Sequence, residues 1–483
     1  MNPAGVAIED LLHPWLGRYL GAPGWAKSLA GHAYAAIPKR IRYGAAYDHF
    51  DAAIASTSRG AAAADYAVDR LGETLAWAIE TVPAYREYRH LLGRDPRAAL
   101  RALPITGKLA IKRDPARYLS EAMPRSAALP TFTGGSTSTP MRFWLQKHVT
   151  RPKECAFMDA FRRRVGADGT ETVLALRGRA IRGAGAHGAP WTYEPIRRQL
   201  ALSCDHLSRS FMPAFAEVLA RWRPTLIEAF PSALFALVRW LEDHPLPQFT
   251  RGVKGVMLFS EDVYGFQMEA FRRVFDAPIV AHYGHSERVL MAATLPDDER
   301  YLFWPQYGWL ELLDGRGRPV TQPGRLGYVV GTSFDNRVMP FVRYRTGDLA
   351  MLAAAPHPGF AHFPAVERIA GRVQDFIVCR DGRLVSITAL GTGHFPELCA
   401  IDAMQYEQQE PGRVVLKAVA PGKLSPRDMR RMAAAVEARM EGGCGVEVVQ
   451  VECIERTPRG KARMLVQHLD VRGRFDALQR ERT

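Results

Sequence analysis

Apolar residues in the first hundred positions recur at helical spacing. In the stretch YAVDRLGETLAWAIETV (residues 66–82), they fall on one face of an α-helix. The residues on this face are Val68, Leu71, Leu75, Ala76 and Ile79. We therefore predict that residues 1–100 are mainly helical and contribute packing rather than chemistry.

From about residue 130 to residue 370, short apolar runs alternate with longer amphipathic ones. The runs TVLALRG (172–178) and GVKGVMLFS (252–260) are typical of short buried strands. Between them, residues 211–222 place Phe211, Phe215, Val218, Leu219 and Trp222 on one helical face, and residues 231–244 predict a second amphipathic helix. Strands that alternate with helices predict an α/β core. Beyond that core, an Asp-Gly pair at residues 314–315 predicts a hairpin.

The last hundred or so residues have the pattern of a small α+β unit. A hairpin is predicted around Asp381–Gly382, and strands are predicted at RVVLKAVA (413–420) and VEVVQVECI (446–454). The helix between these strands starts at Ser425, a typical capping residue, and ends at Gly442. We divide the chain into a helical extension of the large domain (1–60), the rest of that domain (61–371) and a C-terminal domain (372–483).

Composition narrows the class of protein. The chain has 483 residues, of which 47% are hydrophobic and 24% charged, as in ordinary globular proteins. No apolar run approaches the roughly 18–20 residues of a membrane helix, and the first residues lack the pattern of a signal peptide. The six cysteines form no C-x-x-C pair, which argues against a zinc or dithiol motif. We therefore expect a cytoplasmic protein with reduced thiols and no membrane span.

The net charge of +14 suggests an anionic partner. The arginines are scattered, however, and the densest basic groups, at residues 39–42 and 162–164, are short. We interpret this charge as attracting small anions such as nucleotides rather than nucleic acid.

Residues 131–140, TFTGGSTSTP, combine glycines with hydroxyl side chains. Glycines let backbone N–H groups approach an anion, and hydroxyls add donors, so a phosphate-binding loop is one interpretation. A Walker A loop is excluded by its spacing, and the hydrolase pattern G-x-S-x-G fails because Ser138 replaces the last glycine. A loop without chemistry remains the alternative.

Two later segments carry further candidate chemistry. In HYGHSERV (282–289), Tyr283 could stack on a base and Glu287 could hold Mg²⁺ through oxygen. His282 and His285 could form a metal pair, but loop or core histidines are the favoured interpretation. In PFVRYRTGDLA (340–350), Asp348 follows a predicted tight turn and could accept both hydroxyls of a ribose or could satisfy its own backbone.

The order of these segments is more specific than any one of them. Gly-Arg-x-x-Asp at 371–375 and Pro-x-Gly-Lys-x-Arg at 458–463 complete a series that spans some 330 residues. This series resembles the adenylate-forming superfamily of acyl-CoA synthetases, adenylation domains and luciferases. Within it, the segments LPITGKLAIKRD (103–114) and RPTLIEAFPSALFALVRWL (223–241) resemble the phenylacetate–CoA ligase branch, especially its CapK-type members. The resemblance covers roughly residues 60–470.

The resemblance implies a fold and a set of site residues. The expected fold is a large N-terminal α/β domain with a small mobile C-terminal α+β domain. The expected phosphate-loop residues are Thr133, Gly135, Ser136 and Thr137. Tyr283 and Gly284 are expected to bind adenine, Glu287 to bind Mg²⁺ and Asp348 to bind the ribose. Arg372 is expected to support the ribose or the interdomain contact, and Gln374 to be the hinge. Lys461 is expected to contact the acid and the α-phosphate. The acid pocket is expected around Phe230, Phe235 and Phe259, for which core packing is the alternative.

The resemblance also implies a reaction. We expect an AMP-forming acid–thiol ligase that uses ATP and Mg²⁺ to make an acyl-adenylate and then a thioester with CoA or a carrier protein. The acid is expected to be an aryl or medium acyl acid. One alternative is adenylation followed by direct amide or ester formation or AMP transfer. The other is an impaired nucleotide-binding homologue, which is suggested because Gly134, Ser138 and Gln374 depart from the family pattern.

Overall fold

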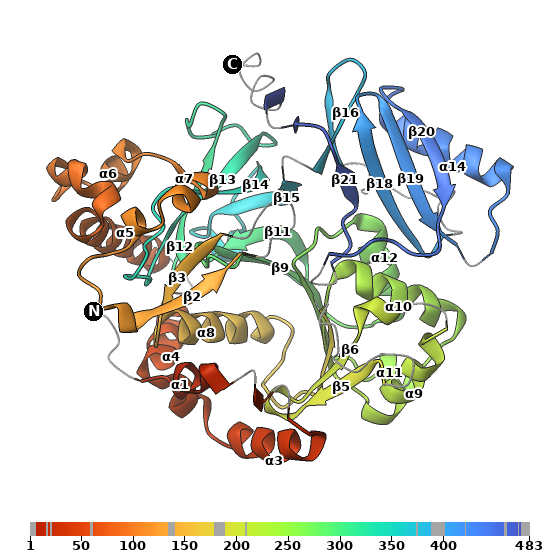
Figure 1. Cartoon of the computed structure of the whole chain (residues 1–483), viewed down its shortest axis with the longest axis horizontal. Helices are drawn as coiled ribbons and strands as arrows, with labels where there is room; N and C mark the ends of the chain where they lie inside the picture. Colours follow the sequence, from red (N-terminus) through yellow and green to blue (C-terminus); the bar gives the residue numbers. More distant parts are fainter. Residues whose placement is uncertain are drawn as a thin grey trace. The chain divides into compact units, whose positions relative to one another are not determined.

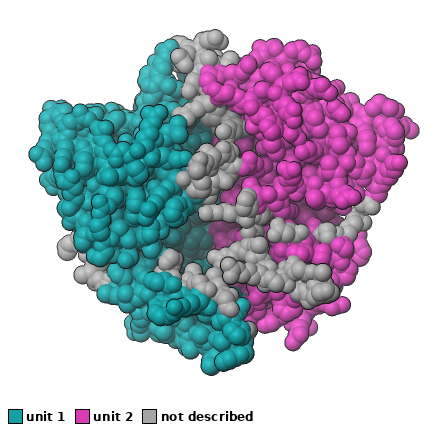
Figure 2. Space-filling model, in the orientation of Figure 1, with its two compact units in different colours: residues 1–170, 194–198, 280–368 teal, residues 171–193, 199–279, 369–483 magenta. Residues whose placement is uncertain are grey.

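Figure 1 shows the computed structural model of the chain. It describes residues 6–15, 18–19, 22–57, 61–133, 141–177, 189–207, 210–372, 375–387, 401–420, 422–457, 461–471 and 473–474. The chain forms two compact units (Figure 2). Unit 1 contains residues 1–170, 194–198 and 280–368, and unit 2 contains residues 171–193, 199–279 and 369–483.

Helices dominate the N-terminal part of unit 1, as the apolar pattern predicted. They are α1 (Ile8–Leu12), α3 (Gly24–Ala35), α4 (Lys39–Ser56), α5 (Ala62–Thr81), α6 (Pro96–Ala102), α7 (Lys108–Arg113) and α8 (Thr150–Arg163), with 3-10 turns η2 (Pro83–Leu91) and η3 (Ala116–Tyr118). Helix α5 buries Leu71, Leu75 and Ile79 on the expected face. Ala78 is also buried there, whereas Ala76 is only half-buried.

The strands of unit 1 form a sheet in the order β12-β13-β14-β15-β11-β10-β9, with β1 beside β14. They are β1 (Thr106–Gly107), β9 (Ile279–Gly284), β10 (Met291–Leu295), β11 (Asp298–Phe303), β12 (Gly308–Leu313), β13 (Leu326–Ser333), β14 (Tyr344–Leu352) and β15 (Ala365–Arg372), and a separate hairpin joins β2 (Ala128–Phe132) to β3 (Arg142–Gln146). Strands β12 and β13 pair antiparallel, so the predicted hairpin exists, and Asp314 lies at the start of its connection.

Unit 2 contains the predicted alternation of strands and helices. Its strands lie in the order β8-β7-β4-β6-β5, and β4, β6, β7 and β8 run parallel. They are β4 (Val173–Leu176), β5 (Trp191–Glu194), β6 (Gln199–Leu202), β7 (Leu226–Ala229) and β8 (Gly255–Phe259), and the helices include α9 (Met212–Trp222), α10 (Pro231–Asp243) and α12 (Gly265–Val274). The predicted face of α9 was wrong at Phe211, which precedes the helix and is 37% exposed, because Met212 takes the buried position.

The C-terminal part of unit 2 has its own sheet, in the order β20-β19-β18-β21. Its strands are β18 (Ala403–Glu410), β19 (Arg413–Val419), β20 (Gly445–Gln450) and β21 (Leu465–Gln467), accompanied by the hairpin of β16 (Phe376–Val378) with β17 (Leu384–Ser386) and by α14 (Pro426–Arg439). Ser425 caps α14 as predicted, since its hydroxyl accepts the N–H of Asp428 at 3.1 Å. Strands β18 and β21 were not predicted.

The combination of a mixed sheet with flanking helices confirms the predicted α/β class. None of the helices in the described parts of the chain is long and apolar enough to cross a membrane.

Candidate active site

Glu287 lies in unit 1, in the connection between β9 and β10, and is only 8% exposed. Its Oε1 accepts a hydrogen bond of 2.8 Å from the hydroxyl of Tyr344, the first residue of β14. This bond fixes the direction of the carboxylate and joins two of the predicted motifs. Among the described residues, no group of three or more histidine, cysteine or acidic side chains is placed to hold a metal ion.

Asp348 and Tyr283 also come together in unit 1. The Tyr283 hydroxyl donates to Asp348 Oδ2 at 2.8 Å, although the two residues are 65 positions apart. Tyr283 is 8% exposed, and the edge of its ring packs against Phe303. Gly284 follows at the end of β9, where a Cβ would lie 2.7 Å from the His282 ring. The predicted adenine and ribose residues are thus direct neighbours.

The backbone around Asp348 differs from the sequence prediction. We predicted a tight turn after a strand, but Asp348 lies inside β14. The pairing of β14 with β13 shifts register between Tyr328 and Val330, which is a β-bulge, and Gly347 at this shift has a φ of +92°. A bulge re-aims a side chain without ending the strand, which is how Asp348 reaches Tyr283.

Thr133 stands where the β2–β3 hairpin ends, at the start of the predicted phosphate loop. Its N–H donates to the Met141 carbonyl at 3.0 Å, and its hydroxyl accepts the Met141 N–H at 2.9 Å. The residue is 7% exposed. Its two hydrogen bonds to Met141 hold the two ends of the loop together. The other predicted loop residues, Gly135, Ser136 and Thr137, lie outside the described residues.

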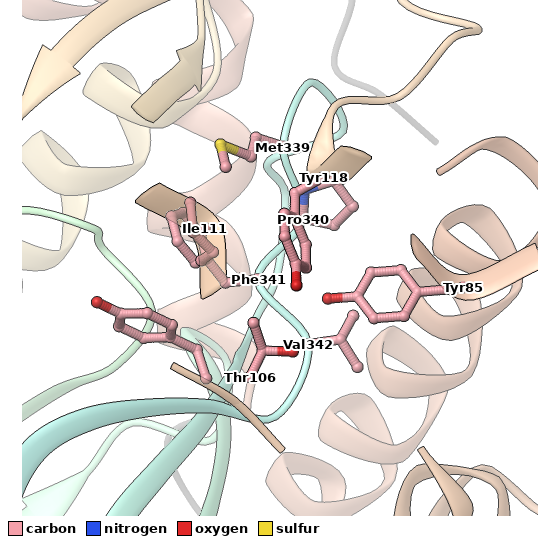
Figure 3. A pocket seen from close by; sticks show the side chains of 9 residues that line it. Tyr85, Thr106, Ile111, Tyr118, Met339, Pro340, Phe341 and Val342 are labelled. Atoms are coloured by element: carbon pink, nitrogen blue, oxygen red, sulfur yellow. The ribbon is translucent and has the colours of Figure 1, made fainter. Parts of the chain in front are cut away.

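A small pocket lies behind Tyr344 in unit 1 (Figure 3). Its lining residues are Tyr85, Thr106, Ile111, Tyr118, Met339, Pro340, Phe341, Val342 and Tyr344. Figure 3 shows the hydroxyl of Tyr85 directed into the pocket. Its interior has essentially no room for even a water molecule, whereas ligand sites typically enclose roughly 300–1,000 Å³. We therefore interpret it as part of the support of β14 rather than as a substrate site.

Lys461 lies in unit 2, beside Phe230, one of the aromatic residues predicted for the acid pocket. Its ammonium donates to the Ser260 carbonyl at 3.1 Å and lies 5.8 Å from the centre of the Phe230 ring. Phe230 follows β7 and Phe259 ends β8, so both stand at the same edge of the parallel strands. They are 5% and 4% exposed, whereas Phe235, on α10, is half-buried and meets Phe266 edge-on.

Arg372 ends β15 with an exposed side chain. Its N–H donates to Asp375 Oδ2 at 2.6 Å. Gly371 before it has a φ of +76°, and a Cβ there would lie 2.7 Å from Asp375 Oδ2, so this turn requires glycine. Gln374, the predicted hinge, lies outside the described residues.

Sequence reasoning missed Ser260 and Glu261, which follow β8 directly. Glu261 Oε1 accepts the N–H of Ala462, next to Lys461, at 3.0 Å. Burial raises the pKa of Glu261, against the effect of the Ser232 N–H and of the positive charges on Arg456 and Lys461. The sequence did contain a signal for Glu261. This acidic residue directly follows a predicted buried strand, at the edge where the substrate pocket was expected.

No known family profile and no curated protein sequence matches the chain. Solved structures do match it. A 2-hydroxyisobutyryl-CoA ligase in the postadenylation state matches in two complexes, each over 86% of this chain and 91% of that one. The complex with R3-HIB-AMP matches at 19% identity and a TM-score of 0.61, and the complex with 2-HIB-AMP at 18% identity and a TM-score of 0.62. The acyl acid amido synthetase AtGH3.15, in complex with 2,4-DB, matches at 12% identity and a TM-score of 0.56 over 90% of this chain and 96% of that one.

At such low identities these matches establish a shared fold. The chain shares its fold with this CoA ligase and this amido synthetase. The fold class expected from the order of the motifs is therefore confirmed.

Proposed function

We propose that the protein is an ATP-dependent ligase that activates a small carboxylic acid as its acyl-adenylate and then transfers the acyl group to a thiol. The main support is the position of Lys461, whose ammonium reaches the Ser260 carbonyl and the Phe230 ring across some 200 residues of sequence. In a chain with this fold, a cation beside an aromatic ring at the end of parallel strands suits a carboxylate substrate.

The first step needs both charge stabilisation and positioning. A carboxylate oxygen attacks the α-phosphorus of ATP, the new P–O bond gives acyl-AMP, and pyrophosphate leaves with the electron pair of the broken bond. Negative charge accumulates on phosphoryl oxygens in the transition state, so a correctly placed cation lowers the barrier. Lys461 supplies this charge and holds the acid against the α-phosphate.

Unit 1 supplies residues suited to the nucleotide. Asp348 accepts the ribose hydroxyls, and the Tyr283 hydroxyl holds its carboxylate in place. Tyr283 and Gly284 border the adenine, and Thr133 begins the loop that binds the phosphates, with Gly135, Ser136 and Thr137.

Glu287 fits a magnesium site. Mg²⁺ in nucleotide enzymes is usually held by one or two carboxylates together with phosphate oxygens. A single carboxylate oriented by the Tyr344 hydroxyl matches that requirement. When bound, Mg²⁺ would neutralise charge on the phosphates.

In the second step we propose that residues 372–483 rotate about Arg372 and Gln374. Lys461 then leaves the adenylate, and a thiol attacks the acyl carbon to form the thioester and release AMP. We propose CoA as the thiol, with a carrier protein as its alternative. We also propose that the chain belongs to the phenylacetate–CoA ligase branch, with its CapK-type members. We also propose a cytoplasmic location and an aryl or medium acyl acid, which suits Phe230, Phe235 and Phe259.

A panel of carboxylic acids with ATP, Mg²⁺ and hydroxylamine tests the proposal. We expect a hydroxamate and one pyrophosphate per turnover with at least one aryl or medium-chain acid, and a CoA thioester when CoA replaces hydroxylamine. Products with amines or alcohols but not with CoA would favour amide or ester formation instead. An absence of turnover with every acid would leave a nucleotide-binding homologue.

A further inference from the structure

The loop that carries Lys461 contacts the turn after β8 at two consecutive residues. Lys461 Nζ donates to the Ser260 carbonyl at 3.1 Å, and the Ala462 N–H donates to Glu261 Oε1 at 3.0 Å. The first contact involves the long, rotatable side chain of the lysine. The second holds the backbone beside it and therefore determines where that side chain starts.

Glu261 connects this loop to the predicted acid pocket. Its second oxygen, Oε2, accepts the N–H of Ser232 at 3.0 Å, in the first turn of α10. Phe230, the ring beside the Lys461 ammonium, is the N-terminal neighbour of that helix. One carboxylate thus accepts a backbone N–H from the lysine loop and another from the segment that bears the aromatic ring.

The turn that presents Glu261 has an unfavourable backbone conformation. Ser260 has a φ of +65°, a left-handed value that is unfavourable for a residue with a side chain. The Glu261 N–H closes the turn on the Phe259 carbonyl at 2.9 Å. Such conformations persist where the surrounding structure requires them, and they gather at functional sites.

The lysine loop is also held from its own side. The Thr457 N–H donates to the Lys461 carbonyl at 2.9 Å, and the Lys461 N–H donates to the Thr457 hydroxyl at 3.1 Å. The buried Gln405 of β18 donates to the Arg463 carbonyl at 2.9 Å. These bonds hold Thr457, Lys461 and Arg463 in place, so a further bond at Ala462 fixes the backbone on which the lysine side chain stands.

We propose that Glu261 is a positioning residue for the activation step: its carboxylate docks the lysine loop against the acid pocket through Ala462 and Ser232. This inference rests on the proposed function for its effect on catalysis, but the docking itself does not. The same bond must break when Lys461 leaves for the second step, so Glu261 favours the first step over the second.

Comparison of the two half-reactions tests this role. In Glu261→Gln the amide oxygen can accept one N–H, but its NH₂ group cannot accept the other. Loss of one charge-assisted hydrogen bond predicts a fall in adenylate formation of about ten- to a hundredfold, with benzoate, phenylacetate and hexanoate as probe acids. Thioester formation from the synthetic acyl-adenylate should stay within about twofold, since that step does not need the docked loop.

Matched variants separate docking from general stability. Glu242 lies on α10 in unit 2, and its carboxylate pairs with Arg273 at 2.7 Å. The control variant Glu242→Gln removes this carboxylate and should leave both half-reactions unchanged. Glu261→Asp keeps the charge and should recover part of the adenylation rate. Equal losses in both half-reactions for Glu261→Gln and Glu261→Asp would overturn the proposal.

Amide hydrogen exchange of the full chain measures docking without catalysis. Exchange at Ala462 should be faster in Glu261→Gln than in the unsubstituted chain and unchanged in Glu242→Gln. If Glu261→Gln does not fold, Glu261→Asp takes its place, with a smaller increase expected. Unchanged exchange at Ala462 refutes the docking even if the enzyme is active, whereas faster exchange in a chain that activates no acid keeps the docking and refutes only the proposed function.

Discussion

At the scale of single residues, the proposed activation of the acid depends most on Lys461. Lys461→Ala should reduce adenylate formation by about three orders of magnitude or more, because a charge aimed at the transition state is lost. Rapid-quench measurement of pyrophosphate checks this. Thioester formation from supplied acyl-adenylate should survive, and a comparable loss in that half-reaction would argue against a role specific to activation.

Protonation of Glu261 should weaken activation. Burial raises the pKa of the Glu261 carboxyl above the ordinary value of 4.5, and the cations of Arg456 and Lys461 partly oppose this shift. Tyr264 is the other titratable group that interacts with this carboxyl. Both oxygens of the ionised carboxylate accept a backbone N–H, and protonation turns one of these acceptors into a donor, so the protonated acid holds the loop less well. The adenylation rate should therefore fall as the pH drops through this raised pKa, and a pH–rate profile checks it.

The control for this pH dependence is Glu261→Gln, which has no carboxyl to titrate. Its profile should lack the acidic limb seen in the unsubstituted chain. An identical limb in both proteins would assign the titration to another group.

At the scale of secondary-structure elements, a buried ion cluster fastens two helices of unit 1 to the end of β13. Lys153 of α8 donates to Asp335 Oδ2 at 3.0 Å and to the Tyr307 carbonyl at 2.7 Å. Arg70 of α5 pairs with the other oxygen of the same carboxylate. Lys153 and Arg70 hold the pKa of Asp335 below its ordinary value.

Asp335→Asn should destabilise unit 1 by about 3–5 kcal/mol at neutral pH, because it leaves the buried Lys153 ammonium without its counter-charge. A carboxyl whose pKa is lowered by folding adds stability above its unfolded-state pKa and loses it as the pH falls through the folded one. The difference in the free energy of unfolding between the two chains, measured by urea denaturation, should therefore narrow only when the pH falls below 3.8, the ordinary pKa of the group. A constant difference down to lower pH would contradict the ion cluster.

Elements with a clear apolar period were predictable, and those defined by tertiary pairing were not. Helix α5 and the fully buried strands β4 and β8 follow directly from their sequence patterns. Strand β18 was missed because its sequence, AMQYEQQE, is mostly polar, although Gln405 and Gln408 are buried and hydrogen-bonded. A tight turn was predicted at Gly347 where the structure has a β-bulge, because a glycine with positive φ is typical of both features.

The candidate site was predictable only in part, for a similar reason. Glu287, Asp348 and Lys461 stand in recognisable motifs, so their residue types and order were sufficient to single them out as candidates. The role proposed for Glu261 depends on two backbone N–H groups, of Ser232 and of Ala462, and the second lies about 200 positions away in the sequence. Such a contact has no local signature, and only the folded chain brings Ala462 to it.

At the scale of the whole molecule, the two units carry complementary sets of groups. Unit 1 holds the Tyr283–Asp348 and Tyr344–Glu287 pairs, which suit a nucleotide and its metal ion. Unit 2 holds Lys461 with the aromatic residues suited to an acid. The proposed reaction joins a carboxylate to a nucleotide and therefore needs both sets.

Transfer of ¹⁸O from the acid to AMP tests this account most directly. If the carboxylate attacks the α-phosphorus, one of its oxygens becomes the bridge of acyl-AMP and stays on AMP when the thiol attacks the acyl carbon. With ¹⁸O-labelled acid, ATP, Mg²⁺ and CoA, mass spectrometry should find one ¹⁸O in each AMP released. Unlabelled AMP, or label found only in inorganic phosphate, would contradict activation of the acid as an adenylate.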